Sequence, residues 1–99
     1  MIEITPIELH KKMQQEKIFL LDVREPYEHE AFNIGGLLIP LDELMSRADE
    51  IPLNEPVVVY CKRGIRSQLA IQRLDKLGFN NLINLKGGME FWKREIERG

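Results

Sequence analysis

Four stretches of the chain are rich in apolar residues and are bounded by polar or turn-forming residues. They are IEI, IFLLDV, VVVY and NLINL, at residues 2–4, 18–23, 57–60 and 81–85. Uninterrupted apolar runs, such as the one that ends at Cys61, are typical of strands that are covered on both faces. A brief extended piece follows the glycine turn within residues 33–41. The pattern therefore predicts five strands.

Segments with helical character lie between these strands. The first, residues 5–17, has Thr5 in the N-cap position, Pro6 as the first helical residue and Glu8 closing a capping box. The other predicted helical segments are residues 25–32, 41–51, 64–78 and 87–98.

Apolar residues at helical spacing predict which side of two segments faces the core. In the 41–51 segment this stripe consists of Leu41, Leu44, Met45 and Ala48. In the 64–78 segment the predicted core face consists of Ala70, Ile71, Leu74 and Leu77. The opposite, polar face consists of Gln68, Gln72, Asp75 and Lys76. Gly78 is predicted to end that helix.

Strands that alternate with helices predict an α/β fold with a central, mainly parallel five-stranded sheet flanked by helices on both faces. No repeat or linker divides the 99 residues, so we expect a single domain over residues 1–99. Ligands of such sheets bind at the carboxyl ends of the strands, where loops lead into helix N-termini. Cys61 directly follows the 57–60 run and therefore lies at this edge.

The composition limits the classes of function. A formal net charge of -2 argues against general nucleic-acid binding, which needs a basic surplus. The longest apolar run is too short to cross a membrane, and the first residues do not form a secretory signal. One cysteine cannot form an internal disulfide or a cysteine-rich metal site, so we expect no metal. We expect a monomer in the cytoplasm, where a free thiol stays reduced.

The residues that follow Cys61 favour a reactive thiol. Lys62, Arg63 and Arg66 bring positive charge, and the N-terminus of the next predicted helix directs unpaired N–H groups toward the loop. Such surroundings lower the pKa of a cysteine, and Gly64 leaves the loop amides unobstructed. The pattern predicts an accessible thiolate in a cationic bowl. An inert cysteine packed in the core is the alternative that these features leave open.

Three blocks of the sequence resemble the rhodanese family. CKRGIRS, residues 61–67, resembles its active-site loop, in which an arginine lies five positions after the cysteine. LLDVREPYE, residues 20–28, is similar to its first signature, an apolar strand that ends in Asp-x-Arg before an acidic helix. NLKGGMEFW, residues 84–92, is similar to its last signature, a strand, two glycines and a helix with a tryptophan. The resemblance implies a rhodanese-like fold over most of the chain.

This resemblance implies a sulfurtransferase of the thiosulfate sulfurtransferase type. Cys61 is the implied nucleophile: it attacks the outer sulfur of a small anionic donor such as thiosulfate or of a persulfide donor, and a persulfide remains on Cys61. A thiol or a sulfur-carrier protein then accepts the sulfur. The reaction needs no cofactor, and an ionised thiol needs no general base. We expect His10 and His29 to be exposed helix residues rather than catalytic ones.

Roles follow for the loop and its supports. The amides of the loop are expected to surround the terminal sulfur; they belong to Lys62, Arg63, Gly64, Ile65, Arg66 and Ser67. Arg66 is expected to direct its guanidinium at the anion or at the carbonyls of the loop. Lys62 and Arg63 either guide the donor or form a solvated rim, and Ser67 is expected to cap the helix rather than to donate a hydrogen bond to the sulfur.

Two more groups are expected to support the site. Asp22 and Arg24 end a neighbouring strand, where we expect a buried pair that holds the sheet end and the loop in place. Trp92 is expected in the core or in the wall of the pocket. The chain departs from the family at Asn33-Ile34-Gly35-Gly36-Leu37, where many members have His-Ile-Pro-Gly-Ala. This variant is similar to rhodanese domains fused to ubiquitin-activating-type adenylyltransferases, which suggests a sulfur-carrier partner.

Two other functions remain as alternatives. A cysteine phosphatase or arsenate reductase has its arginine six positions after the cysteine, where this chain has Ser67, and many phosphatases have a histidine where it has Tyr60. The shorter loop suits a single sulfur atom better than a tetrahedral oxyanion. A non-catalytic interaction module is the second alternative, and the retained cysteine and cationic loop argue against it.

Overall fold

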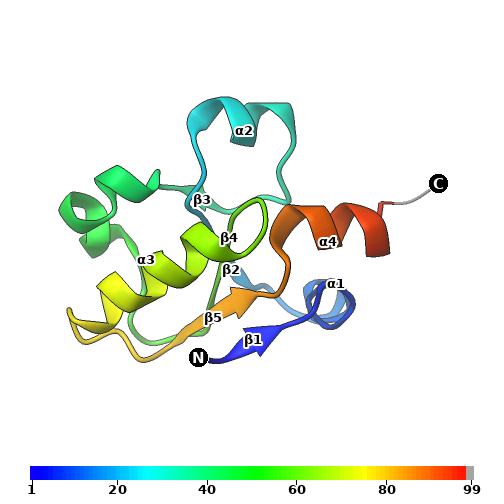
Figure 1. Cartoon of the computed structure of the whole chain (residues 1–99). Helices are drawn as coiled ribbons and strands as arrows, with labels where there is room; N and C mark the ends of the chain where they lie inside the picture. The colour runs from blue at the N-terminus through cyan, green and yellow to red at the C-terminus, as the bar shows by residue number, and fades with distance from the viewer. Residues whose placement is uncertain (98–99) are drawn as a thin grey trace.

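Five parallel strands form one sheet in the order β1-β5-β4-β2-β3. The computed structural model describes residues 1–97. The strands are β1 (Glu3–Ile4), β2 (Phe19–Asp22), β3 (Leu37–Leu38), β4 (Val57–Tyr60) and β5 (Leu82–Leu85). The predicted five strands are thus confirmed, and all of their pairings are parallel (Figure 1).

Helices connect the strands at the predicted places. They are α1 (Pro6–Gln15), α2 (Pro26–Ala31), α3 (Ile65–Asp75) and α4 (Gly88–Glu95). The capping box of α1 is confirmed: the Glu8 amide donates to Thr5 Oγ1 at 3.2 Å and the Thr5 amide donates to Glu8 Oε1 at 2.9 Å. The predicted closing helix ends at Glu95, and Arg98 lies outside the described residues.

Residues 41–51 are helical, as predicted, but the helical form is 3₁₀ and not α, and the predicted core stripe is wrong at Met45. This segment forms two 3₁₀ helices, η1 (Leu41–Glu43) and η2 (Met45–Glu50), with a kink at Arg47. A 3₁₀ helix aligns side chains three residues apart, so Leu41 and Leu44 pack on the core while Met45 is turned outward and is 48% exposed.

The predicted core face of α3 is right except at its end. Ala70, Ile71 and Leu74 are buried, but Leu77 is 50% exposed. The helix ends at Asp75, and the next turn is tighter because the Leu77 amide donates to the Leu74 carbonyl at 2.9 Å. This turn rotates Leu77 away from the core. Gly78 then reverses the chain at a φ of 95°, as predicted, and Phe79 is buried instead.

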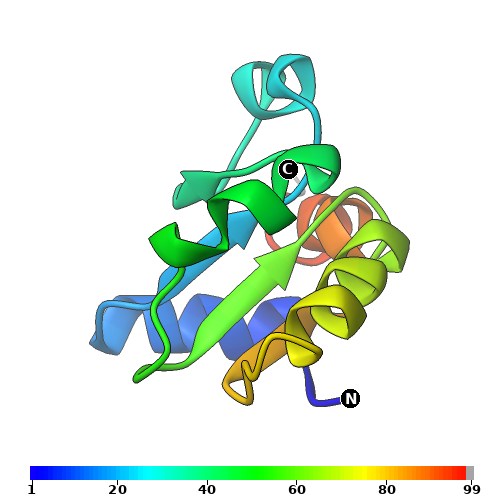
Figure 2. The same cartoon turned by 90° about the vertical axis from the view of Figure 1, so that its left-hand side faces the viewer.

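Successive residues of the inner strands point into two apolar layers, one on each face of the sheet. Val57 and Val59 pack under α3 and the 3₁₀ helices, whereas Val58 and Tyr60 pack under α1 and α4. The two views show α1 and α4 on one side of the sheet and α3 on the other (Figures 1 and 2). Because both faces are covered, β4 is buried along its whole length.

The carboxyl ends of β2 and β4 lie at the edge of the sheet where α2 projects (Figure 1). In this register Asp22 lies beside Tyr60, so that Cys61 and the residues after Asp22 lie at the same edge. Within the described part of the chain, no helix combines the length and the apolar character that a membrane crossing requires.

Candidate active site

The loop between β4 and α3 folds around the Cys61 sulfur. The backbone amides of Gly64 and Ser67 donate to Cys61 Sγ at 3.1 Å and 3.3 Å. Gly64 is the N-cap of α3 and has a φ of 92°, a left-handed conformation that favours glycine. The expectation of an accessible thiol is wrong in this structure, since Cys61 is 1% exposed. The loop amides and the core beneath α3 enclose it.

Ser67 contributes its side chain to a buried network and not to a helix cap. The Cys61 thiol lies 3.4 Å from Ser67 Oγ, which donates to Oδ1 of the buried Asn84. Asn84 Nδ2 in turn donates to Glu3 Oε2 at 2.9 Å. The expected cap is wrong because Gly64 already occupies the N-cap position and Ser67 lies within the first turn of α3, facing β5. The network links the sulfur to two strands.

The guanidinium of Arg66 binds a carboxylate and not the loop carbonyls. Arg66 donates to Glu28 of α2 through both terminal nitrogens, at 2.8 Å and 2.9 Å. This forked geometry is the strongest arrangement of an arginine and a carboxylate. Arg66 lowers the pKa of Glu28 to about 2 from the ordinary 4.5, chiefly through these hydrogen bonds. Glu28 therefore remains an anion at any physiological pH.

Arg63 and Lys62 differ in their surroundings. Arg63 Nε donates to Glu90 of α4 at 2.8 Å, in a pair whose side chains are 64% and 47% exposed. Lys62 is exposed and forms no ion pair with any of residues 1–97. The loop is thus less cationic than the sequence predicted, because helices α2 and α4 supply carboxylates to both of its arginines.

Asp22 and Arg24 form a buried ion pair at the end of β2, as expected from the sequence. Arg24 donates to Asp22 through Nη2 at 2.8 Å and through Nε at 2.9 Å, and Nη2 also donates to the Phe32 carbonyl at 2.7 Å. The pair ties the end of β2 to the end of α2. Arg24 also lies 5.4 Å from the centre of the Tyr60 ring, next to Cys61 in the chain.

The two histidines are half-buried, so the expectation that both are exposed is wrong. His29 Nδ1 lies 2.8 Å from Asp22 Oδ2, because α2 returns toward the end of β2 and brings this side chain to the buried carboxylate. His10 packs edge-on against Trp92, with 5.7 Å between the ring centres. Neither is hydrogen-bonded to Cys61 within the described residues. Trp92 is 3% exposed and lies in the core, as expected.

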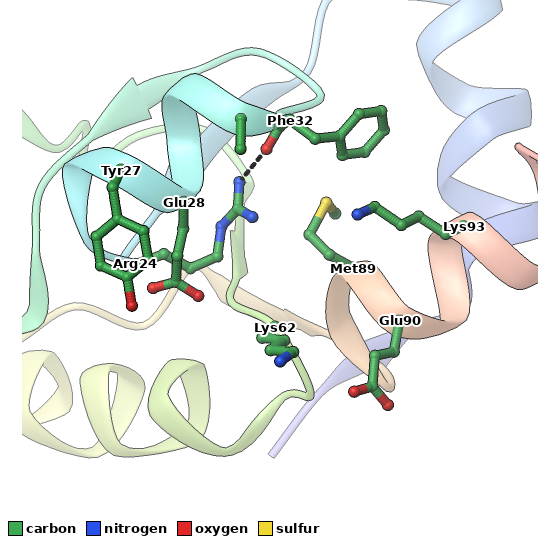
Figure 3. Close-up of a pocket in the computed structure, with 9 residues that line it drawn as sticks. Arg24, Tyr27, Glu28, Phe32, Lys62, Met89, Glu90 and Lys93 are labelled. Atoms are coloured by element: carbon green, nitrogen blue, oxygen red, sulfur yellow. Dashed lines mark hydrogen bonds between the residues drawn. The ribbon is translucent and has the colours of Figure 1, made fainter.

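A pocket of about 280 Å³ lies between α2, the start of the loop and α4 (Figure 3). It is lined by Arg24, Tyr27, Glu28, Ala31, Phe32, Lys62, Met89, Glu90 and Lys93. Charged groups of both signs therefore surround a partly apolar hollow. Among the described residues, no three histidine, cysteine or acidic side chains are grouped so that they could hold a metal ion.

A sequence model of the rhodanese-like domain matches residues 5–95. The chain belongs to the rhodanese-like domain family. Its fold is that of the human single-domain sulfurtransferase TSTD1, which aligns with a TM-score of 0.84 at 27% identity over 96% of this chain and 97% of TSTD1. Family membership and this neighbour support sulfur transfer as the general chemistry of the domain.

Two relatives of this rhodanese-like domain come from Bacillus subtilis. The uncharacterized protein YqhL is 44% identical over 82 residues, and the putative sulfur carrier protein YrkF is 39% identical over 83 residues. These alignments cover 82% and 83% of this chain. The chain spans 65% of the length of YqhL and 45% of the length of YrkF.

Sequence reasoning gave no role to three residues that contact the active-site loop of this rhodanese-like domain, namely Glu28, Asn84 and Glu90. Asn84 is a buried polar side chain inside the apolar NLINL stretch, and this break in the pattern was a signal that could have found it. Glu28 lies in the first signature of the family, but its pairing with Arg66 joins residues 38 positions apart. No local pattern in the sequence indicates that contact.

Proposed function

We propose that this rhodanese-like domain is a sulfurtransferase of the thiosulfate sulfurtransferase type. It takes a sulfane sulfur from thiosulfate or a persulfide donor, holds it as a persulfide on Cys61 and passes it to a thiophilic acceptor. The observation that carries this proposal is the convergence of the Gly64 and Ser67 amides on Cys61 Sγ, at 3.1 Å and 3.3 Å. N–H groups that are held in this direction stabilise negative charge on sulfur.

The proposed reaction has two displacement steps. The Cys61 thiolate attacks the sulfane sulfur of thiosulfate, a bond from Cys61 Sγ to that sulfur forms, and the S–S bond of thiosulfate breaks with its electron pair leaving on sulfite. A thiolate acceptor then attacks the outer sulfur of the persulfide, and Cys61 leaves as a thiolate. The two steps balance without an external oxidant or reductant. A thiolate is a strong nucleophile, so the first step needs no general base.

The residues around Cys61 are proposed to hold the persulfide and its donor. The amides of residues 62–67 surround the terminal sulfur. The buried pair of Asp22 and Arg24 fixes the end of β2 beside the loop, which is supported by its four hydrogen bonds. Lys62 guides the anionic donor, because its side chain is exposed, lines the pocket and has no carboxylate partner among residues 1–97.

The acceptor is proposed to be a small thiol or a sulfur-carrier protein. The likeness to YrkF, named as a putative sulfur carrier, supports the second of these. An exposed apolar side chain at the start of α3 also supports it, since Ile65 is 72% exposed. We place the whole chain, as a single domain, in the cytoplasm, where a free catalytic thiol stays reduced.

Mass spectrometry of the intact protein tests the proposal. After incubation with thiosulfate, the wild type is expected to gain the mass of one sulfur atom, which a reducing thiol then removes. Cys61→Ser removes the sulfur nucleophile while keeping a side chain of similar size, so it is expected to gain none. Thiocyanate formation from thiosulfate and cyanide should follow the same pattern. Hydrolysis of an aryl phosphate at a comparable rate would favour the phosphatase alternative instead.

The burial of the Cys61 thiol is a specific observation in support of one alternative function, the non-catalytic interaction module. Cys61 is 1% exposed, which suits a non-catalytic interaction module as well as an enzyme whose loop opens for its donor. A chain that neither gains sulfur nor reacts with iodoacetamide in the folded state would support the module. Sulfur gain by the wild type would support the enzyme.

A further inference from the structure

Carboxylates of two helices occupy the guanidinium groups of the active-site loop. Glu28 of α2 binds Arg66 with both oxygens, and its side chain is 14% exposed against 33% for Arg66. Glu90 of α4 binds Arg63 at 2.8 Å on the more exposed side of the loop. The pKa of Arg66 is raised, chiefly by its hydrogen bonds to Glu28. The positive charge of each arginine is therefore balanced by a carboxylate from a neighbouring helix.

The same two carboxylates line the pocket from opposite sides. Glu28 and Glu90 both border it, together with Lys62 at the start of the loop (Figure 3). The guanidinium of Arg24 also borders it, but its charge is balanced by the buried Asp22. An anion that enters here thus meets carboxylates on two helices, each paired with an arginine of the loop, as well as the ammonium groups of Lys62 and Lys93. An anion that needs Arg66 must compete with a carboxylate that is held by two hydrogen bonds.

The position of Glu28 is fixed by more than Arg66. Its Oε1 atom also accepts a hydrogen bond from the Glu25 amide at 3.0 Å, at the start of α2. The Glu28 carboxylate therefore cannot move away from the pocket without losing its hydrogen bonds to Arg66 and to the Glu25 amide. A charge that is held in this way at low exposure is less screened by salt than a mobile surface charge.

We propose that Glu28, with Glu90 in support, is a specificity-determining residue that disfavours doubly charged sulfur donors relative to singly charged ones. This inference rests on the proposed sulfurtransferase function and narrows its donor. Relative to a neutral side chain at this position, the fixed charge of Glu28 favours an organic sulfane-sulfur donor with a single negative charge over the doubly charged thiosulfate. The energetic basis is the repulsion between a fixed carboxylate and each additional unit of charge on the donor.

Two donors of similar shape and different charge isolate this effect. Thiosulfate carries two negative charges, and methanethiosulfonate, with a methyl group in place of one oxygen, carries one. In each case the Cys61 thiolate bonds to the sulfane sulfur, the donor S–S bond breaks, and its electron pair leaves on sulfite or on methanesulfinate. Cyanide then removes the outer sulfur as thiocyanate and restores the thiolate. Both donors therefore give the same measured product.

The experiment compares kcat/KM for the two donors at one ionic strength. Glu28→Gln keeps the shape of the side chain and an acceptor for the Glu25 amide while removing the charge. It is expected to raise the ratio of kcat/KM for thiosulfate to that for methanethiosulfonate by about fivefold, the effect of one nearby unit charge in water. Glu90→Gln is expected to raise this ratio by a smaller factor, because Glu90 is 47% exposed. It also provides a second variant if Glu28→Gln fails to fold.

Glu30→Gln is the matched control, because it removes one negative charge from an exposed position on the same helix. Its ratio is expected to stay at the wild-type value. Sulfur transfer with the same ratio in all four proteins would overturn the inference while leaving the proposed function intact. No transfer from either donor by the folded wild type would instead overturn the proposed function.

Discussion

At the scale of single residues, Glu28 connects two elements through one carboxylate. It accepts hydrogen bonds from the Glu25 amide within α2 and from Arg66 of α3. Both contacts stabilise its ionised form, which is why its pKa lies at about 2 instead of 4.5. A residue with a depressed pKa in the folded state contributes stability at any pH above its ordinary pKa. That contribution is lost as the pH falls toward the depressed value.

Replacing Glu28 should therefore change how stability depends on pH. Glu28→Gln is expected to lower the free energy of unfolding by about 1 kcal/mol at neutral pH, because it breaks a partly buried ion pair. The difference from wild type should shrink as the pH falls from 4.5 toward about 2, where Glu28 itself becomes protonated. Urea unfolding over this range measures it, with Glu30→Gln as the control. A difference that does not change with pH would contradict the assigned ion pair.

The sequence could locate some residues of the site and not others. Cys61 and Gly64 follow a buried strand directly, so their place at the sheet edge is a local property of the chain. The partners of Arg66 and Ser67 lie 38 and 17 positions away, and only the packing of helices on the sheet brings them together. The sequence did not predict the burial of the Cys61 thiol for the same reason: residues distant in the chain pack around it.

At the scale of elements, caps and periodicity predict where helices begin better than how they end. Thr5 and Glu8 form their capping box within four residues, which makes the start of α1 visible in the sequence. The 41–51 segment has a helical stripe as well, but the fold winds it into 3₁₀ turns with a kink at Arg47. The stripe does not distinguish these two helical forms, because it contains residues three apart, which both forms place on the same side.

The end of α3 provides a matched pair of leucines for a test of packing. Leu74 is fully buried and Leu77 is 50% exposed, although both were predicted on the core face. Leu74→Ala is expected to lower the free energy of unfolding by about 2 to 5 kcal/mol, because it leaves a cavity beneath the helix. Leu77→Ala should change it by no more than about 0.5 kcal/mol. Urea denaturation followed by circular dichroism measures both values, and equal losses would show that Leu77 packs in the core.

At the scale of the whole molecule, the three sequence blocks that resemble the rhodanese family meet around Cys61. The first supplies Asp22, Arg24 and Glu28, and the second is the loop itself. The third begins α4, where the Met89 amide donates to the Cys61 carbonyl at 2.9 Å. The Glu90 amide likewise donates to the Lys62 carbonyl at 2.9 Å. The start of α4 therefore holds the backbone of the loop from behind.

Gly88 has no Cβ atom and therefore lets α4 lie against the loop. Alanine variants of Gly88 and Gly78 can separate the effect of this close contact from the effect of backbone strain. A Cβ atom on Gly88 would lie 2.7 Å from the Lys62 carbonyl oxygen, whereas one on Gly78 would meet no atom within 4 Å. Both residues have a positive φ, so either alanine costs about 1 to 2 kcal/mol from strain. Gly88→Ala is expected to cost more and also to reduce sulfur transfer, since α4 must move away from the loop.

Thermal unfolding and thiocyanate formation, measured on both variants, decide the role of Gly88. Gly78→Ala should keep the transfer rate of the wild type, because Gly78 lies beyond the end of α3, far along the chain from the loop. Gly88→Ala should lose transfer activity even at temperatures where it remains folded, because a displaced loop no longer directs its amides at the sulfur. Equal activity in the two variants would show that the loop keeps its geometry without α4.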